Sequence, residues 1–181
     1  MFADGIPTIV RSMLESRAPI KVRSGKPGDA KALAGVFKES WQQAYRGIIP
    51  HVHLEHMIRR RGPDWWRSTV RAGDTVLLVE LAGEVVGYAT TGTARTRGPY
   101  QGEIYEIYMM PSHQGLGFGE YLFEAARAGL DSRGLNGLLV WALSENSSAT
   151  DFYWRRGGRP VAKTIEHIGG AKLEKIAFAW Q

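Results

Sequence analysis

The stretch MMPSHQGLGFGEYLF, at residues 109–123, constrains the fold of this chain more than any other. It places Gly115, Gly117 and Gly119 at alternate positions, between an apolar segment and a segment with helical spacing. Glycine lets the backbone turn sharply and approach another molecule closely. At the start of a helix, such a loop directs backbone N–H groups and the positive end of the helix dipole into one concavity. The stretch therefore predicts a strand, a loop and a helix, and the loop is either an anion-binding site or a plain flexible turn.

The other segments surround this loop with further strands and helices. Apolar, β-branched and aromatic runs predict strands at 20–25, 75–81, 84–95, 102–110 and 138–143, and two more that meet at Gly169-Gly170. Apolar residues at helical spacing predict helices at about 30–44, at 51–72 with a break near Gly62-Pro63, from the loop to about Leu130, and at about 147–156. We therefore expect one α/β domain over residues 20–181, with a sheet of mixed direction. Residues 1–19 are interpreted as an extension with a short helix around 6–16.

Composition narrows the possible functions. The chain has 181 residues and no cysteine, so disulfides, thiolate metal sites and a cysteine nucleophile are excluded. The formal net charge is +5, but basic residues are scattered among acids and the only dense run is RRR at 59–61. We expect an anionic small ligand rather than a nucleic acid. No apolar run reaches the roughly 18 residues of a membrane helix, so we expect a cytoplasmic protein without membrane contact.

Three known phosphate-binding patterns can be compared with the loop. A P-loop requires a lysine after its last glycine, where this chain has Glu120. The dinucleotide pattern Gly-x-Gly-x-x-Gly opens the first strand–helix unit of a domain, whereas this loop has a different spacing and lies late in the chain. The third pattern is a strand, then Gln or Arg-x-x-Gly-x-Gly, then a helix. Gln114, Gly117 and Gly119 fill it.

Three segments together resemble the GNAT superfamily of N-acetyltransferases. GEIYEIYMMPSHQGLGFGEYLFEAA resembles the acetyl-CoA signature of that family, and LVWALSENSSATDFYWRRGG resembles its second conserved block. SWQQAYRGIIP is similar to the first-helix region of many bacterial members. The resemblance covers about residues 20–181 and implies the GNAT fold, a central mixed, mostly antiparallel, twisted sheet with a splayed strand pair and flanking helices. One departure is Gly157-Gly158-Arg159, where the family commonly has Gly-Phe.

The resemblance implies acetyl-CoA as cosubstrate and assigns residues to it. The main chain of Ile107, Tyr108 and Met109 would pair with the pantetheine arm. Asn146 would touch the same arm, although an asparagine there is also a good helix N-cap. Amides along the loop would bind the pyrophosphate, with the Phe118 side chain packed inward; the loop residues are Gln114, Gly115, Leu116, Gly117, Phe118 and Gly119.

The same resemblance implies catalytic residues. Tyr153 matches the usual general acid, which protonates the departing thiolate of CoA, although a half-buried core tyrosine is the alternative. Glu103 matches the general base of some members, and Glu106 is the second candidate. Because strand side chains alternate, these two carboxylates should face opposite sides unless a bulge intervenes. The backbone N–H of Ile107 would lie near the developing oxyanion.

The acceptor is less constrained. Trp41, Tyr45 and Arg46 resemble the region that walls the acceptor pocket, but aromatic residues suit a core equally well. The histidines of HVHLEH lack a known zinc spacing, so we expect no metal. The implied reaction is acetyl transfer from acetyl-CoA to a primary amine of a small molecule or peptide, by direct attack in a ternary complex. The alternative is a non-catalytic acyl-CoA-binding sensor. The resemblance also favours a homodimer, because members of this family are often dimers.

Overall fold

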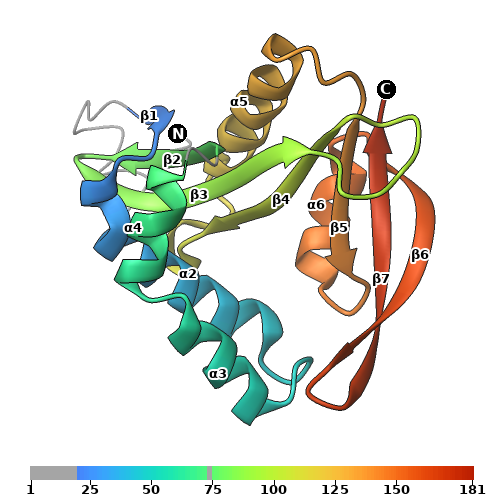
Figure 1. Ribbon diagram of the computed structural model, residues 1–181, viewed down its shortest axis with the longest axis horizontal. Helices are drawn as coiled ribbons and strands as arrows, with labels where there is room; N and C mark the ends of the chain where they lie inside the picture. Colours follow the sequence, from blue (N-terminus) through green and yellow to red (C-terminus); the bar gives the residue numbers. More distant parts are fainter. Residues whose placement is uncertain (1–19, 73–74) are drawn as a thin grey trace, which may run out of the picture.

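Seven strands form one sheet in this computed structural model, which describes residues 20–72 and 75–181 (Figure 1). The strand order is β1-β2-β3-β4-β5-β7-β6. All neighbours pair antiparallel except β4 and β5, which are parallel. The strands are β1 (Lys21–Ser24), β2 (Thr75–Leu81), β3 (Glu84–Thr93), β4 (Gly102–Met109), β5 (Leu138–Leu143), β6 (Arg159–Ile168) and β7 (Ala171–Trp180). The predicted mixed, mostly antiparallel sheet is confirmed, and the helix predicted around 6–16 lies outside the described residues.

Five α-helices of the described residues flank the sheet. They are α2 (Ala30–Tyr45), α3 (His51–Arg60), α4 (Pro63–Arg71), α5 (Phe118–Ser132) and α6 (Ser147–Arg155), with short 3₁₀ turns η1 (Pro27–Asp29) and η2 (Pro111–His113). Gly47 adopts a left-handed φ of 83° in the turn between α2 and α3. Pro63 begins α4, a position where its missing N–H costs nothing. No helix in these described ranges has the length and apolarity that crossing a membrane requires.

The two larger apolar cores lie on opposite faces of the sheet. The helices α2, α3 and α4 cover one face, where Phe37, Trp66 and Tyr88 are fully buried. On the other face α5 packs through Leu122 and Phe123, and α6 adds Tyr153. Helical and strand periodicity thus divide the apolar residues between two layers.

Trp180 fills the space beside Gly158, at the place where the sequence departs from the usual family pattern. A Cβ atom at Gly158 would collide with the Trp180 ring. The indole Nε1 of Trp180 donates to the carbonyl of Arg156 at 2.8 Å, and its ring packs 5.1 Å from that of Phe123. An aromatic ring from the last strand therefore occupies this part of the core.

The parallel strands β4 and β5 pair over a short distance and then diverge (Figure 1). Their register joins Gly102–Ile104 to Leu138–Val140, whereas β4 continues to Met109 and β5 to Leu143. The sheet is therefore split between these strands at the end where the glycine loop and the start of α6 lie.

Candidate active site

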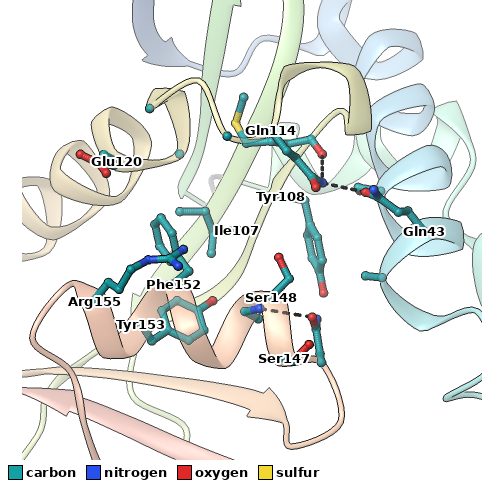
Figure 2. Close-up of a pocket in the computed structure, with 18 of the residues that line it drawn as sticks. Gln43, Ile107, Tyr108, Gln114, Glu120, Ser147, Ser148, Phe152, Tyr153 and Arg155 are labelled. Atoms are coloured by element: carbon teal, nitrogen blue, oxygen red, sulfur yellow. Dashed lines mark hydrogen bonds between the residues drawn. The ribbon is translucent and has the colours of Figure 1, made fainter.

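A cavity of about 660 Å³ opens where β4 and β5 diverge (Figure 2). Its walls come from α2, the second half of β4, the glycine loop with the first turn of α5, and one face of α6 along its length. The residues predicted from sequence that line it are Ile107, Tyr108, Met109, Gln114, Gly115, Gly117, Gly119, Asn146 and Tyr153. Segments more than one hundred residues apart in the chain thus meet around one space.

The glycine loop turns through two left-handed residues. Gly115 has a φ of 74° and Gly117, the N-cap of α5, has a φ of 85°. A Cβ atom at either position would meet no atom within 4 Å, so these glycines leave open space beside the cavity. Phe118 is buried in the α5 core, as predicted. The loop therefore presents main chain rather than side chains to the cavity.

One hydrogen bond shows to which side the main-chain N–H and C=O groups of β4 point. The N–H of Met110 donates to Val86 of β3 at 2.8 Å. Because main-chain groups alternate in direction along a strand, those of Ile107 and Met109 face away from β3 and into the gap that β5 leaves. The Met109 carbonyl accepts a hydrogen bond from Gln114 Nε2 at 3.1 Å, in agreement with this direction.

Asn146 and Tyr153 lie on the α6 side of the cavity. Asn146 caps α6, because its Oδ1 accepts a hydrogen bond from the N–H of Ala149 at 3.3 Å. The Tyr153 hydroxyl points toward the cavity in Figure 2, while the ring is buried against Phe178 and Trp180. Burial raises the pKa of Tyr153 above the usual value of 10, and the neighbouring Tyr45 adds to that rise. The hydroxyl therefore keeps its proton at neutral pH.

The two candidate bases share a face of β4 because of a β-bulge. The register between β3 and β4 shifts at Tyr105, which is an extra residue on β4. Ile104 and Ile107 consequently pack into the same core although they are three residues apart. By the same count Glu103 and Glu106 share the opposite face. The alternation predicted for an unbulged strand does not apply here.

Each of these carboxylates is paired with an arginine. Glu103 is 1% exposed and accepts hydrogen bonds from the Arg95 backbone N–H at 2.8 Å and from its Nη2 at 2.6 Å. Glu106 pairs with Arg61 and accepts a hydrogen bond from the Tyr88 hydroxyl at 3.1 Å. Neither carboxylate lines the cavity.

The residues predicted to wall the acceptor pocket do not line this cavity. Trp41 and Tyr45 are buried in the core beneath α2, and Arg46 is exposed beside a separate depression at the turn after that helix. The guanidinium of Arg61 lies over the Trp41 ring, 5.7 Å from its centroid. Helix α2 instead presents a different face to the cavity, through Ser40, Gln43 and Ala44.

Sequence reasoning did not assign Gln43 or Phe152 to the site, although both line the cavity together with Arg155. Ser148, Phe152 and Arg155 are spaced four and three residues apart, so they share one face of α6. The sequence alone contains this spacing, so these residues could have been predicted from it. They continue the site from Asn146 toward the first turn of α5. Among the described residues, no group of His, Asp and Glu is arranged to hold a metal ion.

Comparison with known proteins agrees with this geometry. The sequence model of the acetyltransferase (GNAT) family matches residues 36–158. The uncharacterized N-acetyltransferase YuaI of Bacillus subtilis is 31% identical over 162 residues, which cover 89% of this chain and 92% of that protein. A mycothiol acetyltransferase of Paenarthrobacter aurescens is 29% identical over 132 residues, which cover 68% of this chain but 39% of that protein.

Solved structures share the fold. PaiA N-acetyltransferase from Thermoplasma acidophilum, in complex with coenzyme A, superposes with a TM-score of 0.72 at 18% identity, covering 90% of this chain and 99% of that one. YncA from Salmonella typhimurium, with acetyl-CoA, gives a TM-score of 0.65 at 21% identity, covering 90% and 93%.

Proposed function

The chain belongs to the GNAT family of acetyltransferases, and on that premise we propose that it transfers the acetyl group of acetyl-CoA to a primary amine of a small molecule or peptide. One observation carries the proposal. The divergence of β4 from β5 brings unpaired main chain, the glycine loop and the Tyr153 hydroxyl to a single cavity of about 660 Å³.

The residues around the cavity fit acetyl-CoA. The left-handed Gly115 and Gly117 leave room for a pyrophosphate, and α5 begins there with its positive dipole end. Arg155, across the cavity on α6, offers a further positive charge. The main-chain groups of Ile107 and the N–H of Met109 would hold an extended pantetheine arm. When bound, acetyl-CoA supplies an activated acetyl group as a thioester.

Two proton movements are required of the chain itself. Tyr153 keeps its proton at neutral pH and is proposed to donate it to the leaving thiolate. Glu106 is proposed as the base for the acceptor ammonium, because it lies on β4 two residues before Tyr108, which lines the cavity, and on the same face of that strand. Glu103 is enclosed by Arg95 and is the second candidate.

The acceptor remains a primary amine without a narrower class. Relatives that match parts of this chain include mycothiol acetyltransferases and an L-methionine sulfoximine/L-methionine sulfone acetyltransferase of Pseudomonas aeruginosa, the latter 27% identical over 107 residues, 58% of this chain and 62% of that protein. The named acceptors of these proteins differ widely. A screen of small and peptide amines is therefore the appropriate approach.

Calorimetric titration tests the proposal first. We expect acetyl-CoA and free CoA to bind saturably and ATP to bind weakly. Thiol release in the presence of an amine panel then separates an enzyme from an acyl-CoA sensor. Absence of CoA binding would overturn the proposal, and binding without thiol release for any amine would favour the sensor.

A further inference from the structure

An ion pair joins the first turn of α5 to the end of α6, beside the cavity. Glu120 is the third residue of α5 and lines the cavity (Figure 2). Arg156 directly follows α6, and its Nη2 atom donates a hydrogen bond to Oε1 of Glu120. The pair therefore connects the helix that follows the glycine loop with the helix that carries Tyr153.

The position of Glu120 is unfavourable for an anionic ligand. Gly117 is the N-cap of α5, so the carboxylate lies in the first turn of the helix. The positive end of a helix dipole attracts any anion, and a carboxylate in the first turn competes with a phosphate for that potential. An uncompensated Glu120 would also repel the phosphates of CoA directly. A positive charge beside Glu120 removes this conflict.

Packing places Arg156 where it can supply that charge. Its guanidinium lies over the ring of Phe152, 5.6 Å from the centroid, and its carbonyl accepts a hydrogen bond from Trp180 Nε1 at 2.8 Å. The Phe152 ring lies against the backbone of α5, since a Cβ atom at Gly119 would be 3.6 Å from it. The guanidinium is thus held next to the first turn of α5.

Stability alone does not account for this ion pair. The Glu120 side chain is 50% exposed, and exposed ion pairs contribute little to folding. The Nε atom of Arg156 is buried and has no hydrogen-bond partner within the described part of the chain, an arrangement that costs stability. The arrangement is therefore better explained by its effect on the charge of the cavity wall.

We propose that Arg156 is a positioning residue that acts through Glu120: by pairing with this carboxylate, it keeps the positive end of α5 available to the phosphates of CoA. The inference rests on the proposed function, because it assumes that the glycine loop holds the pyrophosphate. Arg155, which lines the cavity, remains for direct contact with the ligand.

The test is the dissociation constant of free CoA, measured by calorimetry at low salt for three variants. Arg156→Met keeps an apolar contact with Phe152 but leaves Glu120 uncompensated. We expect it to weaken binding by about three- to tenfold, the scale of one partly exposed unit charge beside a polyanion. Glu120→Gln removes the unfavourable charge and should bind CoA at least as tightly as the wild type. The double variant Glu120→Gln/Arg156→Met should return to within about twofold of the wild type.

These directions separate the charge effect from a mechanical one. If the pair served only to tie α5 to α6, both single variants would bind CoA more weakly and the double variant would not recover. Salt gives an independent readout, because the loss in Arg156→Met should shrink as the salt concentration rises from about 0.02 M to about 0.3 M.

The matched control is Arg67→Met. It removes an arginine that pairs with Asp64 on α4, a helix that contributes no residue to the cavity wall, and it changes the net charge equally. Its CoA affinity should stay within about twofold of the wild type. Weaker binding in Glu120→Gln, or unchanged binding in folded Arg156→Met, would overturn the inference. Failure of the wild type to bind CoA would instead overturn the proposed function.

Discussion

Gln114 of the glycine loop donates a hydrogen bond through Nε2 to Oε1 of Gln43 on α2, at 2.8 Å (Figure 2). The same Nε2 also donates to the Met109 carbonyl at 3.1 Å. The side chain of Gln114 thereby joins three elements of the cavity wall. Its role in this structure is to hold the loop in place, while the main chain of the following glycines faces the cavity.

Removing either side of this contact should weaken CoA binding modestly. We expect Gln43→Ala and Gln114→Ala each to lower the affinity by about two- to tenfold, because the contact is exposed and a typical hydrogen bond contributes about 0.5–1.5 kcal/mol. Calorimetry on both single variants and on the double variant measures the coupling. Losses that multiply fully would show that the two glutamines act independently.

Gly117→Glu should abolish CoA binding, because a charged side chain would enter the open space that the glycine leaves beside the cavity. The matched control is Gly134→Glu at the other end of α5, where φ is 72° and the surrounding space is equally open. Each variant carries a left-handed strain of about 1–2 kcal/mol. Thermal unfolding should therefore fall similarly in both, while only Gly117→Glu loses CoA. Retained binding in folded Gly117→Glu would refute the role of the loop.

Tyr153→Phe should lower turnover by about 10²-fold or more, the lower range for a positioned general acid, and change the CoA dissociation constant by less than about twofold. Since burial raises the pKa of Tyr153 above 10, loss of its proton should not reduce wild-type turnover below pH 10. Steady-state kinetics over pH 6–10 and calorimetry check both expectations. Equal turnover in wild type and variant would remove Tyr153 from the mechanism.

Glu103→Gln and Glu106→Gln distinguish the two candidate bases. For Glu106→Gln we expect turnover to fall by about 10²-fold, because the amide cannot accept a proton from the acceptor ammonium. For Glu103→Gln we expect mainly a loss of folding stability of about 1–3 kcal/mol, because an amide N–H would face the donors of Arg95 in a buried site. Urea unfolding and steady-state kinetics measure both effects. If Glu103→Gln instead lost turnover and Glu106→Gln lost only folding stability, Glu103 would be the base.

Buried tyrosines should make the fold sensitive to alkali. Burial raises the pKa of Tyr45, Tyr88, Tyr108 and Tyr153 above 10. In the unfolded chain these groups lose protons near pH 10, whereas the folded chain keeps them. Stability is thus fully present below pH 10 and falls above it, by up to about 1.4 kcal/mol per pH unit for each tyrosine.

Tyr88→Phe removes one of these groups, so its free energy of unfolding should fall less steeply with pH than that of the wild type. Urea unfolding at pH 9, 10 and 10.5 measures the two slopes. Identical slopes would mean that Tyr88 titrates alike in the folded and unfolded chains.

Local pattern was enough to predict most of the fold. The strands at 75–81 and 138–143 and the turn at Gly169-Gly170 lie where the apolar runs and glycines indicate. The pattern does not say which of the adjacent Trp65 and Trp66 is buried; the structure buries Trp66, whereas Trp65 stays 37% exposed. Periodicity and turn residues are local properties, so they can be recognised without the tertiary structure.

The site was less predictable, because it depends on registers between distant elements. The bulge at Tyr105 arises from pairing with β3 and places Glu103 and Glu106 on the same face, whereas an unbulged strand would place them on opposite faces. Trp41 and Tyr45 share helical spacing with the core, and only the packing of α2 on the sheet decides that Gln43 faces the cavity. Such choices are made by tertiary contacts, which a strand or helix pattern does not contain.

The splayed strand pair has a consequence for association between chains. An unpaired strand edge usually lies at the margin of a sheet, where another polypeptide can add to it. Here the unpaired stretch of β4 lies in the middle of the sheet, between the glycine loop, α2 and α6. A thin, flexible arm can reach its hydrogen-bonding groups, whereas a strand of another chain would have to enter between α2 and α6. An unpaired edge that is covered by other elements in this way is less open to strand addition from another chain than an edge at the margin.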